Sequence, residues 1–262
     1  MHISLAAETL FRIGSFPVSN TLIVAFIISL TLLIFSLFLK KRLTIIPSGV
    51  QNLVEYIIES GFNFIAEIVG NKKLAKKFFP LVFTIFIFVL LSNWVEIIPG
   101  LGTIGVLEIH EGKKIIIPFI RSSSADLNFT LAIAIVSVIS TQLLGILSIG
   151  FLKHLSKYLP FKKLFKITYG FLPVPSFQGF IEFFASFLEI FAELAKIISF
   201  SFRLFGNIFA GEVLLIVITF LIPYLIPLPF LFLEIFVGFV QALIFSMLTL
   251  VFLTMATSEL SH

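Results

Sequence analysis

Cysteine is absent from the 262-residue sequence, and only 12% of its residues are charged. Without cysteine the chain forms no disulfide, thiolate nucleophile or cysteine-bound metal site. It also lacks a glycine-rich phosphate loop, a nucleophile elbow and an HExxH motif, which argues against an ordinary hydrolase or kinase. All four histidines fall outside the long apolar runs, so no metal site within those runs is visible: His2, His110, His154 and His262. We expect no catalytic site, metal or cofactor.

Apolar residues dominate what is present. Hydrophobic residues make up 59% of the chain, and the mean hydropathy is +1.15, values typical of a polytopic membrane protein. A helix crosses the ~30 Å hydrocarbon core with about 20 apolar residues. Five runs reach that length: 21–39, 78–98, 127–152, 179–222 and 230–257. The sequence therefore predicts an all-α polytopic membrane protein, a single domain over 1–262, with residues 1–20 outside the bilayer.

Residues 48–69 predict a sixth, amphipathic helix. Apolar residues recur at helical spacing, polar residues fall mostly on the other face, and Ser48 with Gln51 fits a capping box. Lysines and arginines flank the segment, which favours a helix lying on the membrane surface. The alternative is a helix that pairs with a soluble partner helix.

The lysines and arginines between the runs are distributed unequally. Twelve fall on one predicted side: Lys40, Lys41, Arg42, Lys72, Lys73, Lys76, Lys77, Lys153, Lys157, Lys162, Lys163 and Lys166. Four fall on the other: Arg12, Lys113, Lys114 and Arg121. Cytoplasmic loops carry the excess of positive residues, so the N-terminus is predicted outside and the C-terminus in the cytoplasm. Lysines at membrane edges also account for the net charge of +4 without nucleic-acid binding.

The run 179–222 is too long for a simple crossing. As one helix it would be about 64 Å long at ~1.5 Å per residue. It must therefore tilt steeply, beyond the usual ~0–40°, or kink near Gly206 or Gly211. The last run, 230–257, is also long enough to require tilt. We expect the two to form a steeply tilted hairpin.

Arg203 lies deep in this long run, with apolar stretches on both sides. An arginine there costs at least ~2.5–3.5 kcal/mol, and its guanidinium cannot lose its proton to avoid that cost. It needs a carboxylate or water nearby, and a functional role is the default interpretation. The alternative is a structural charge satisfied inside a helix bundle.

A helical wheel at 100° per residue separates the polar groups of this run into two sets. Those within about 80° of Arg203 are Glu189, Glu193, Lys196, Ser199 and Asn207. Glu212 lies nine residues beyond Arg203, about 180° away. Two separate water-filled paths that meet near one fixed cation would produce this pattern.

The last run carries Glu234, Gly238 and Gln241 on one helix face. Glu212 and Glu234 flank the turn at 223–229, so a hairpin could bring the two acids together on the outer side. Two independent acids in water at the membrane edge are the alternative.

Two specific motifs stand out in the chain, SFRLFGNIFAGE at 201–212 and RSSSADLNFTL at 121–131. Asn93 with Pro99-Gly100, and QALIF at 241–245 with Leu248-Thr249, accompany them. Together these motifs resemble subunit a of the F-type ATP synthase membrane sector. The likeness extends from Pro17 to Glu259, in the same order and with the right number of spans.

The resemblance implies roles for single residues. Arg203 would face a rotating ring of c subunits, make each arriving ring carboxyl release its proton, and keep two half-channels apart. Gln241 would lie across from Arg203. The outer half-channel would be lined by Glu212, Glu234, Asn207, Asp126 and Asn128. For the cytoplasmic exit the wheel, rather than the resemblance, suggests Glu193, Glu189, Ser199 and Lys196.

The resemblance also implies partners and location: the c ring, the b subunits of the peripheral stalk, the F1 sector indirectly, and the plasma membrane of a bacterium in preference to an organellar membrane. The ion could be H⁺ or Na⁺. Two alternatives remain at this stage. A self-contained secondary transporter would show internal repeats and broken helices, and no repeat is visible. A membrane scaffold would carry its buried charges for structural reasons alone.

Overall fold

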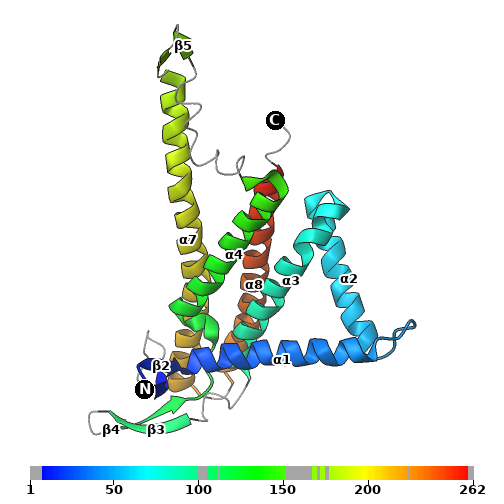
Figure 1. The fold of residues 1–262 in the computed structure, drawn as a ribbon. Helices are drawn as coiled ribbons and strands as arrows, with labels where there is room; N and C mark the ends of the chain where they lie inside the picture. Colours follow the sequence, from blue (N-terminus) through cyan, green and yellow to red (C-terminus); the bar gives the residue numbers. More distant parts are fainter. Residues whose placement is uncertain are drawn as a thin grey trace. The chain divides into compact units, whose positions relative to one another are not determined.

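The computed structural model describes residues 8–98, 105–110, 113–151, 167–169, 172–174, 177–223 and 225–258. These include six α-helices, shown in Figure 1: α1 (Asn20–Arg42), α2 (Val50–Val69), α3 (Lys72–Trp94), α4 (Leu127–Ile149), α7 (Phe177–Leu221) and α8 (Pro227–Ser258). Two short 3-10 helices are η1 (Val95–Ile97) and η3 (Ser123–Ala125). Three antiparallel strand pairs complete the described elements: β1 (Thr9–Ile13) with β2 (Phe16–Ser19), β3 (Gly105–His110) with β4 (Lys113–Pro118), and β5 (Ile167–Tyr169) with β6 (Leu172–Val174).

Five of the helices are long and apolar enough to cross a membrane: α1, α3, α4, α7 and α8. The prediction of an all-α polytopic membrane protein is confirmed. The last two are the longest, with 45 residues in α7 and 32 in α8, against about 20 for a simple crossing. The helix expected at 48–69 is α2, which is amphipathic as predicted.

The first residues of α3 and α2 differ from the sequence prediction, and short-range contacts explain both differences. Helix α3 begins at Lys72 rather than at 78, because the Asn71 side chain accepts hydrogen bonds from the backbone amides of residues 73 and 74. The capping box expected at the start of α2 is wrong. Gly49, at φ +55°, caps this helix without a side-chain bond, and Gln51 instead bonds to Thr44 and Glu55.

The strand pairs were missed in segments expected to be irregular. The β1–β2 hairpin lies within residues 1–20, and Gly14 at its turn has φ +62°, which favours glycine. The β3–β4 hairpin pairs Gly105 with Pro118 through to His110 with Lys113, inside the expected loop 99–125. Two predicted features lie outside the described residues: the Pro99-Gly100 helix end and the lysines of 153–166.

The chain divides into two compact units, Met1–Thr130 with Phe202–Leu250 and Leu131–Ser201 with Val251–His262. In the first unit α2 and α3 form a hairpin, and α1 runs across it as the third side of a triangle (Figure 1). Aromatic rings join α2 to α3: Phe62 meets Phe79 edge-on, and Phe79 stacks on Phe83. An ideal Cβ on Gly61 would lie 3.0 Å from the Phe83 ring, so glycine permits this close approach.

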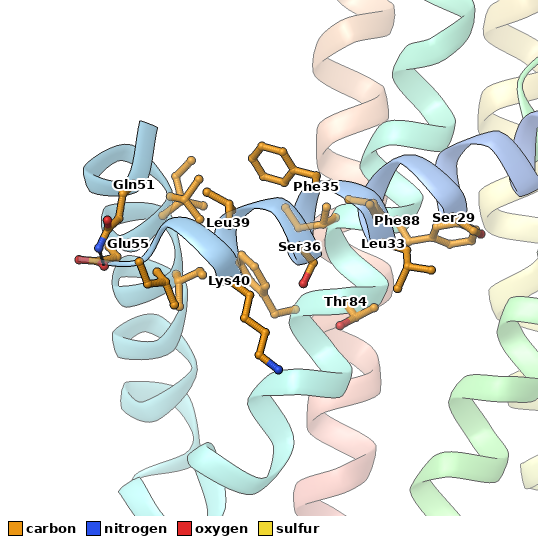
Figure 2. Close-up of a pocket in the computed structure, with 17 residues that line it drawn as sticks. Ser29, Leu33, Phe35, Ser36, Leu39, Lys40, Gln51, Glu55, Thr84 and Phe88 are labelled. Carbon is orange, nitrogen blue, oxygen red and sulfur yellow. Dashed lines mark hydrogen bonds between the residues drawn. The ribbon is translucent and has the colours of Figure 1, made fainter. Parts of the chain in front are cut away.

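The three sides of this triangle line an open, mainly apolar pocket of about 900 Å³. Figure 2 shows Phe35 and Leu39 of α1 and Phe88 of α3 among its lining residues, together with the side chain of Lys40. The hydroxyls of Ser29 and Thr84, also on its wall, bond to backbone carbonyls of their own helices. A cavity needs several polar partners to hold water, so apolar groups suit this space better.

A buried polar network in the first unit ties the ends of several elements together. The hydroxyl of Thr21, at the start of α1, donates to Asp126 Oδ2 at 2.7 Å, and Ser123 donates to the Thr21 carbonyl at 2.9 Å. Ser122 donates to the carbonyl of Ser92 on α3. Asn93, also on α3, donates to the Gly238 carbonyl on α8. Because these side chains are buried, their bonds fix the loop before α4 against α1 and α3.

The second unit holds most of α4, the first part of α7 and the end of α8. Phe200 of α7 stacks on Phe252 of α8, with ring centroids 5.5 Å apart. Lys196 lies 4.4 Å from the centroid of the same Phe252 ring, a cation–π contact. These contacts pack the first part of α7, which carries the charged candidates of this unit, directly against the end of α8.

Replacing Thr21 by valine tests the buried network. Thr21→Val keeps the shape of the side chain but leaves Asp126 Oδ2 without its hydroxyl donor, so it should destabilise the detergent-solubilised subunit by about 1.5–3 kcal/mol. The matched control is Thr84→Val, which removes an exposed hydroxyl bonded only to its own helix. Thermal denaturation should show a clearly lower midpoint for Thr21→Val; equal midpoints would contradict the role of this bond.

Candidate functional site

Helix α7 presents two different faces in its second half. It continues unbroken through Gly206 and Gly211 to Leu221. Arg203 and Asn207 are exposed, whereas Leu204 and Ile208 are only 1% and 2% exposed. Residues three and four apart lie on neighbouring positions of a helix surface, so Arg203 and Asn207 form one outward polar strip. Ser199, one turn earlier, is exposed as well.

Glu212 points to the opposite, inner side, where it meets Arg121. Arg121 Nε lies 3.0 Å from Glu212 Oε1 and donates to Oε2 at 3.2 Å, and a terminal guanidinium nitrogen donates to Oε2 at 3.0 Å. The two side chains are only 6% and 12% exposed. Two guanidinium nitrogens thus face both carboxylate oxygens of Glu212, and such charge-assisted contacts are stronger than hydrogen bonds between neutral groups.

Glu234 of α8 lies beside the same pair. Its side chain is buried against the α7 backbone, since an ideal Cβ on Gly211 would lie 3.1 Å from Glu234 Oε1. The charge of Glu212 acts on it electrostatically. Among the described residues no group bonds to its other oxygen, Oε2, which is also buried. The structure thus brings the two acids of the hairpin together, and engages only one of them with a cation.

Asp126 is fully engaged in the packing of its own segment. One oxygen accepts the Thr21 hydroxyl, and the other accepts the backbone amide of Asn128 at 2.9 Å in the first turn of α4. Such a bond satisfies an amide that the helix start leaves open. Asn128 itself is exposed. Asp126 therefore has a structural role: its side chain holds the start of α4 and binds Thr21 of α1.

Gln241 lies on α8, half-buried, two turns beyond Glu234. Between them Gly238 packs against α3: an ideal Cβ there would lie 3.2 Å from Asn93 and 3.3 Å from Trp94. The glycine lets α3 approach closely, and Trp94 also donates from Nε1 to the Ile235 carbonyl. Glu234, Gly238 and Gln241 share one face of α8, and Gly238 brings that face into contact with α3.

The candidates for the cytoplasmic exit lie in the second unit. Lys196 donates to Glu193 Oε1 at 2.6 Å, an ion pair one helical turn apart. Glu189 is half-buried. With its cation–π contact to Phe252, Lys196 has two attractive neighbours. The wheel had grouped Glu193 and Lys196 on one side of the helix, and the structure pairs them.

Arg121 is the residue that the sequence interpretation missed, because it was counted only as an outer loop charge. The available signal was its position. Three serines and an alanine separate it from Asp126, directly before α4. Small residues of this kind permit tight burial, and all of residues 121–126 are buried. A charge that leads such a segment must be paired.

Comparison with known proteins identifies the family of this chain. Residues 20–254 match the model of the family described as ATP synthase A chain. The chain belongs to this family. It is 32% identical over 232 residues to ATP synthase subunit a of Campylobacter jejuni strain 81-176, covering 88% of this chain and 87% of the relative. Subunit a of Moorella thermoacetica is 29% identical over 244 residues, covering 93% of each chain. Subunit a of Trichlorobacter lovleyi is 30% identical over 244 residues, covering 92% of this chain and 88% of that one.

The expected resemblance to subunit a of the F-type ATP synthase is thereby confirmed. As a member of the subunit a family, the protein is a multi-pass membrane protein, a membrane-sector subunit and channel component of the ATP synthase complex.

A double-mutant cycle tests the buried ion pair. Arg121→Gln or Glu212→Gln alone leaves an uncompensated buried charge and should destabilise the detergent-solubilised subunit by about 3–5 kcal/mol. The double variant removes both charges and should lose much less than the sum of the two. The half-exposed pair Glu193 and Lys196, neutralised in the same way, serves as the control and should couple by about 1 kcal/mol or less. Additive losses at Arg121 and Glu212 in chemical denaturation would contradict the pairing.

Proposed function

We propose that this subunit is the proton-conducting stator of the ATP synthase membrane sector. Two offset aqueous half-channels lead into the membrane from opposite sides, and Arg203 separates them. The observation that carries the proposal is the arrangement on α7: Arg203 is exposed on one side, whereas Glu212, nine residues further along, turns inward and forms a buried ion pair with Arg121. The subunit has no catalytic site of its own and couples ion flow to rotation of a c ring.

The outer half-channel runs past Glu212 and Glu234. Both acids lie in a buried polar region rather than against apolar side chains alone, and Arg121 supplies a positive charge there. Carboxyls can hold and pass a proton within such a path. Asn207, Asp126 and Asn128 are further lining candidates, and Asp126 also supports the packing of the segment.

The exposed guanidinium of Arg203 acts on the carboxyl groups of the ring. Coulomb attraction is strong where the dielectric is low, so a ring carboxylate that passes Arg203 is stabilised as an anion and gives up its proton. Gln241 on α8 faces the same passage. Protonated again from the outer path, the carboxyl is neutral and can enter lipid. Each charge moved through the field contributes ~2.3 kcal/mol per 100 mV, which gives the rotation a direction.

The cytoplasmic half-channel follows the first half of α7. Its candidates are Glu189, Glu193, Lys196 and Ser199, and the pairing of Glu193 with Lys196 supports a polar, charge-balanced strip on this helix. With 45 residues, α7 is about 68 Å long, so the hairpin of α7 and α8 lies steeply tilted in the bilayer. A tilted hairpin lets the two paths open at different places along the ring.

The surrounding assembly follows from the same role. The c ring moves past α7 and α8, the b subunits of the peripheral stalk hold the subunit still, and the F1 sector is reached through them. The named relatives are bacterial, which supports a bacterial plasma membrane. The twelve-to-four distribution of loop lysines and arginines supports an outer N-terminus and a cytoplasmic C-terminus.

Replacing Arg203 tests the central role. In the purified complex reconstituted with its ring, Arg203→Ala should abolish ATP synthesis driven by an imposed proton gradient, because ring carboxyls lose the cation that makes them release protons. Arg12→Ala, which removes an exposed arginine of the β1–β2 hairpin, is the matched control and should leave coupled synthesis intact. Undiminished synthesis in Arg203→Ala, with normal assembly, would overturn the proposal.

The absence of cysteine allows a direct test of orientation. Single cysteines introduced at Arg12 and at Lys73, both exposed, should react with a membrane-impermeant maleimide from opposite sides of oriented vesicles. We expect Arg12→Cys to react only from outside and Lys73→Cys only from the cytoplasmic side. Labelling of both from one side would contradict the five-span topology.

A further inference from the structure

The open pocket between α1, α2 and α3 has a wall built mostly of large apolar side chains. Leucines, isoleucines and phenylalanines from all three helices contribute, among them Leu33 of α1, Ile57 of α2 and Phe83 of α3. Its volume of about 900 Å³ falls within the ~300–1,000 Å³ of pockets that bind small ligands. Such pockets combine apolar walls with a few polar groups that orient the ligand. The polar residues of this pocket therefore indicate what it binds.

Four of the polar residues that line the pocket are bonded within the chain. The hydroxyls of Ser29 and Thr84 donate to carbonyls of their own helices. Gln51 and Glu55 bond to each other, since the amide of Gln51 donates to Glu55 Oε1 at 2.8 Å. Figure 2 shows Glu55 beside Gln51 and well apart from Lys40. The one acid that lines the pocket is thus engaged at some distance from the cation.

Ser36 and Lys40 are the other two polar residues of the lining. They lie four residues apart on α1, so their Cβ atoms are neighbours on the helix surface, about 5–6 Å apart. Figure 2 shows both side chains on the same side of α1, directed toward the space between α2 and α3. Neither forms a hydrogen bond or an ion pair with another described residue. The pocket therefore offers an ammonium and a hydroxyl as donors beside a large apolar surface.

The pocket also distinguishes among the three basic residues that end α1. Lys40 lines it, whereas Lys41 and Arg42 do not. The guanidinium of Arg42 lies 4.4 Å from the centroid of the Phe38 ring, and Lys41 is exposed away from the pocket lining. An ammonium beside apolar surface is stabilised by an anion, because charges interact strongly where the dielectric is low. Lys40 is therefore the one cation of this group that is placed to bind a ligand in the pocket.

We propose that this pocket binds one anionic phospholipid, whose acyl chains lie along the apolar wall and whose phosphate is held by Lys40 and Ser36. Basic pockets between membrane helices, and basic residues at the end of such a helix, are known to bind anionic lipids. A headgroup without an amine fits best, because the single acid of the lining is already bonded to Gln51. The inference is independent of the proposed function, since lipid binding requires neither a proton path nor a ring.

A transmembrane helix of another subunit is the alternative occupant, and the size of the pocket argues against it. A helix with its side chains is ~10–12 Å wide, so about 900 Å³ would hold only about two of its turns. A helix that crosses the membrane needs about 20 residues, which is more than five turns. An acyl chain is much thinner and bends to follow the wall. The donors at Ser36 and Lys40 also match a phosphate better than they match an apolar helix.

The first test measures lipid retention by native mass spectrometry, with dioleoyl phosphatidylglycerol added to the detergent-purified complex. Lys40→Gln should weaken retention on this subunit by about tenfold, because a hydrogen bond between charged groups is lost. Ser36→Ala should weaken it by about threefold. Lys41→Gln is the matched control, since it removes the same charge one position away from the lining, and it should retain lipid normally. Equal losses in Lys40→Gln and Lys41→Gln would overturn the site.

The second test concerns the apolar wall and the headgroup. Leu33→Trp adds a large ring to the lining and should reduce retention, whereas Leu37→Trp changes an equally exposed leucine of α1 outside the lining and should not. Dioleoyl phosphatidylethanolamine, which has the same chains and an added amine, should bind more weakly than phosphatidylglycerol. Equal affinity for the two lipids, or equal retention in the two tryptophan variants, would contradict the proposal. Co-purification with the c ring checks that each variant assembles.

The third test distinguishes the lipid from a partner helix. Phosphatidylglycerol with a photoreactive diazirine in one acyl chain is added to the intact complex and illuminated, and the labelled peptides are sequenced. We expect labels on the lining residues of α1 and α3, such as Leu33 and Phe83, and a clear decrease in Lys40→Gln. If another subunit covers the pocket, these residues will be labelled only in the isolated subunit. That result, or labelling spread evenly over all apolar helices, would overturn the proposal.

Discussion

A charge within an apolar layer must find a partner, and this constraint governs the arrangement of the first unit. No charged residue follows Glu212 in α7, and Arg121 pairs with it from a segment 91 positions away. To reach it, the loop before α4 must be buried between α1 and α3. Ser122, Ser123 and Asp126 make this burial possible, because each forms a hydrogen bond to a neighbouring element.

The same constraint explains why α7 has two kinds of charge. Glu212 is paired within the subunit, whereas Arg203 is exposed at its surface. A guanidinium remains ionised in any environment, so a surface position inside a membrane suits it only where water or an acidic group comes to it. The difference in burial therefore gives α7 one acid in a buried ion pair and one cation at the surface of the subunit.

The sequence predicted the features that depend on composition and spacing along one helix. The five apolar helices and α2 follow from run length and periodicity, and the meeting of Glu212 with Glu234 follows from a short turn between two helices. Contacts between distant segments could not be predicted this way, and Arg121 is the clearest example. The β-hairpins were missed because strands of three to six residues are too short to show a clear alternation of polar and apolar residues. The false capping box arose because Gly49, with its positive φ, begins α2 one residue later than Ser48 would have required.

Helix α8 packs closely on both α7 and α3, and two glycines make this packing possible. Gly211 on α7 and Gly238 on α8 are each approached by side chains from the neighbouring helix, at distances that a Cβ would disturb. The first contact sets the position of Glu234 along α7, and the second sets the position of α8 along α3. Because Gln241 follows Gly238 by less than one turn, its position is set by the same contact. Glu234 and Gln241 are thus held by one segment of α8, so a displacement of that segment would move both side chains together.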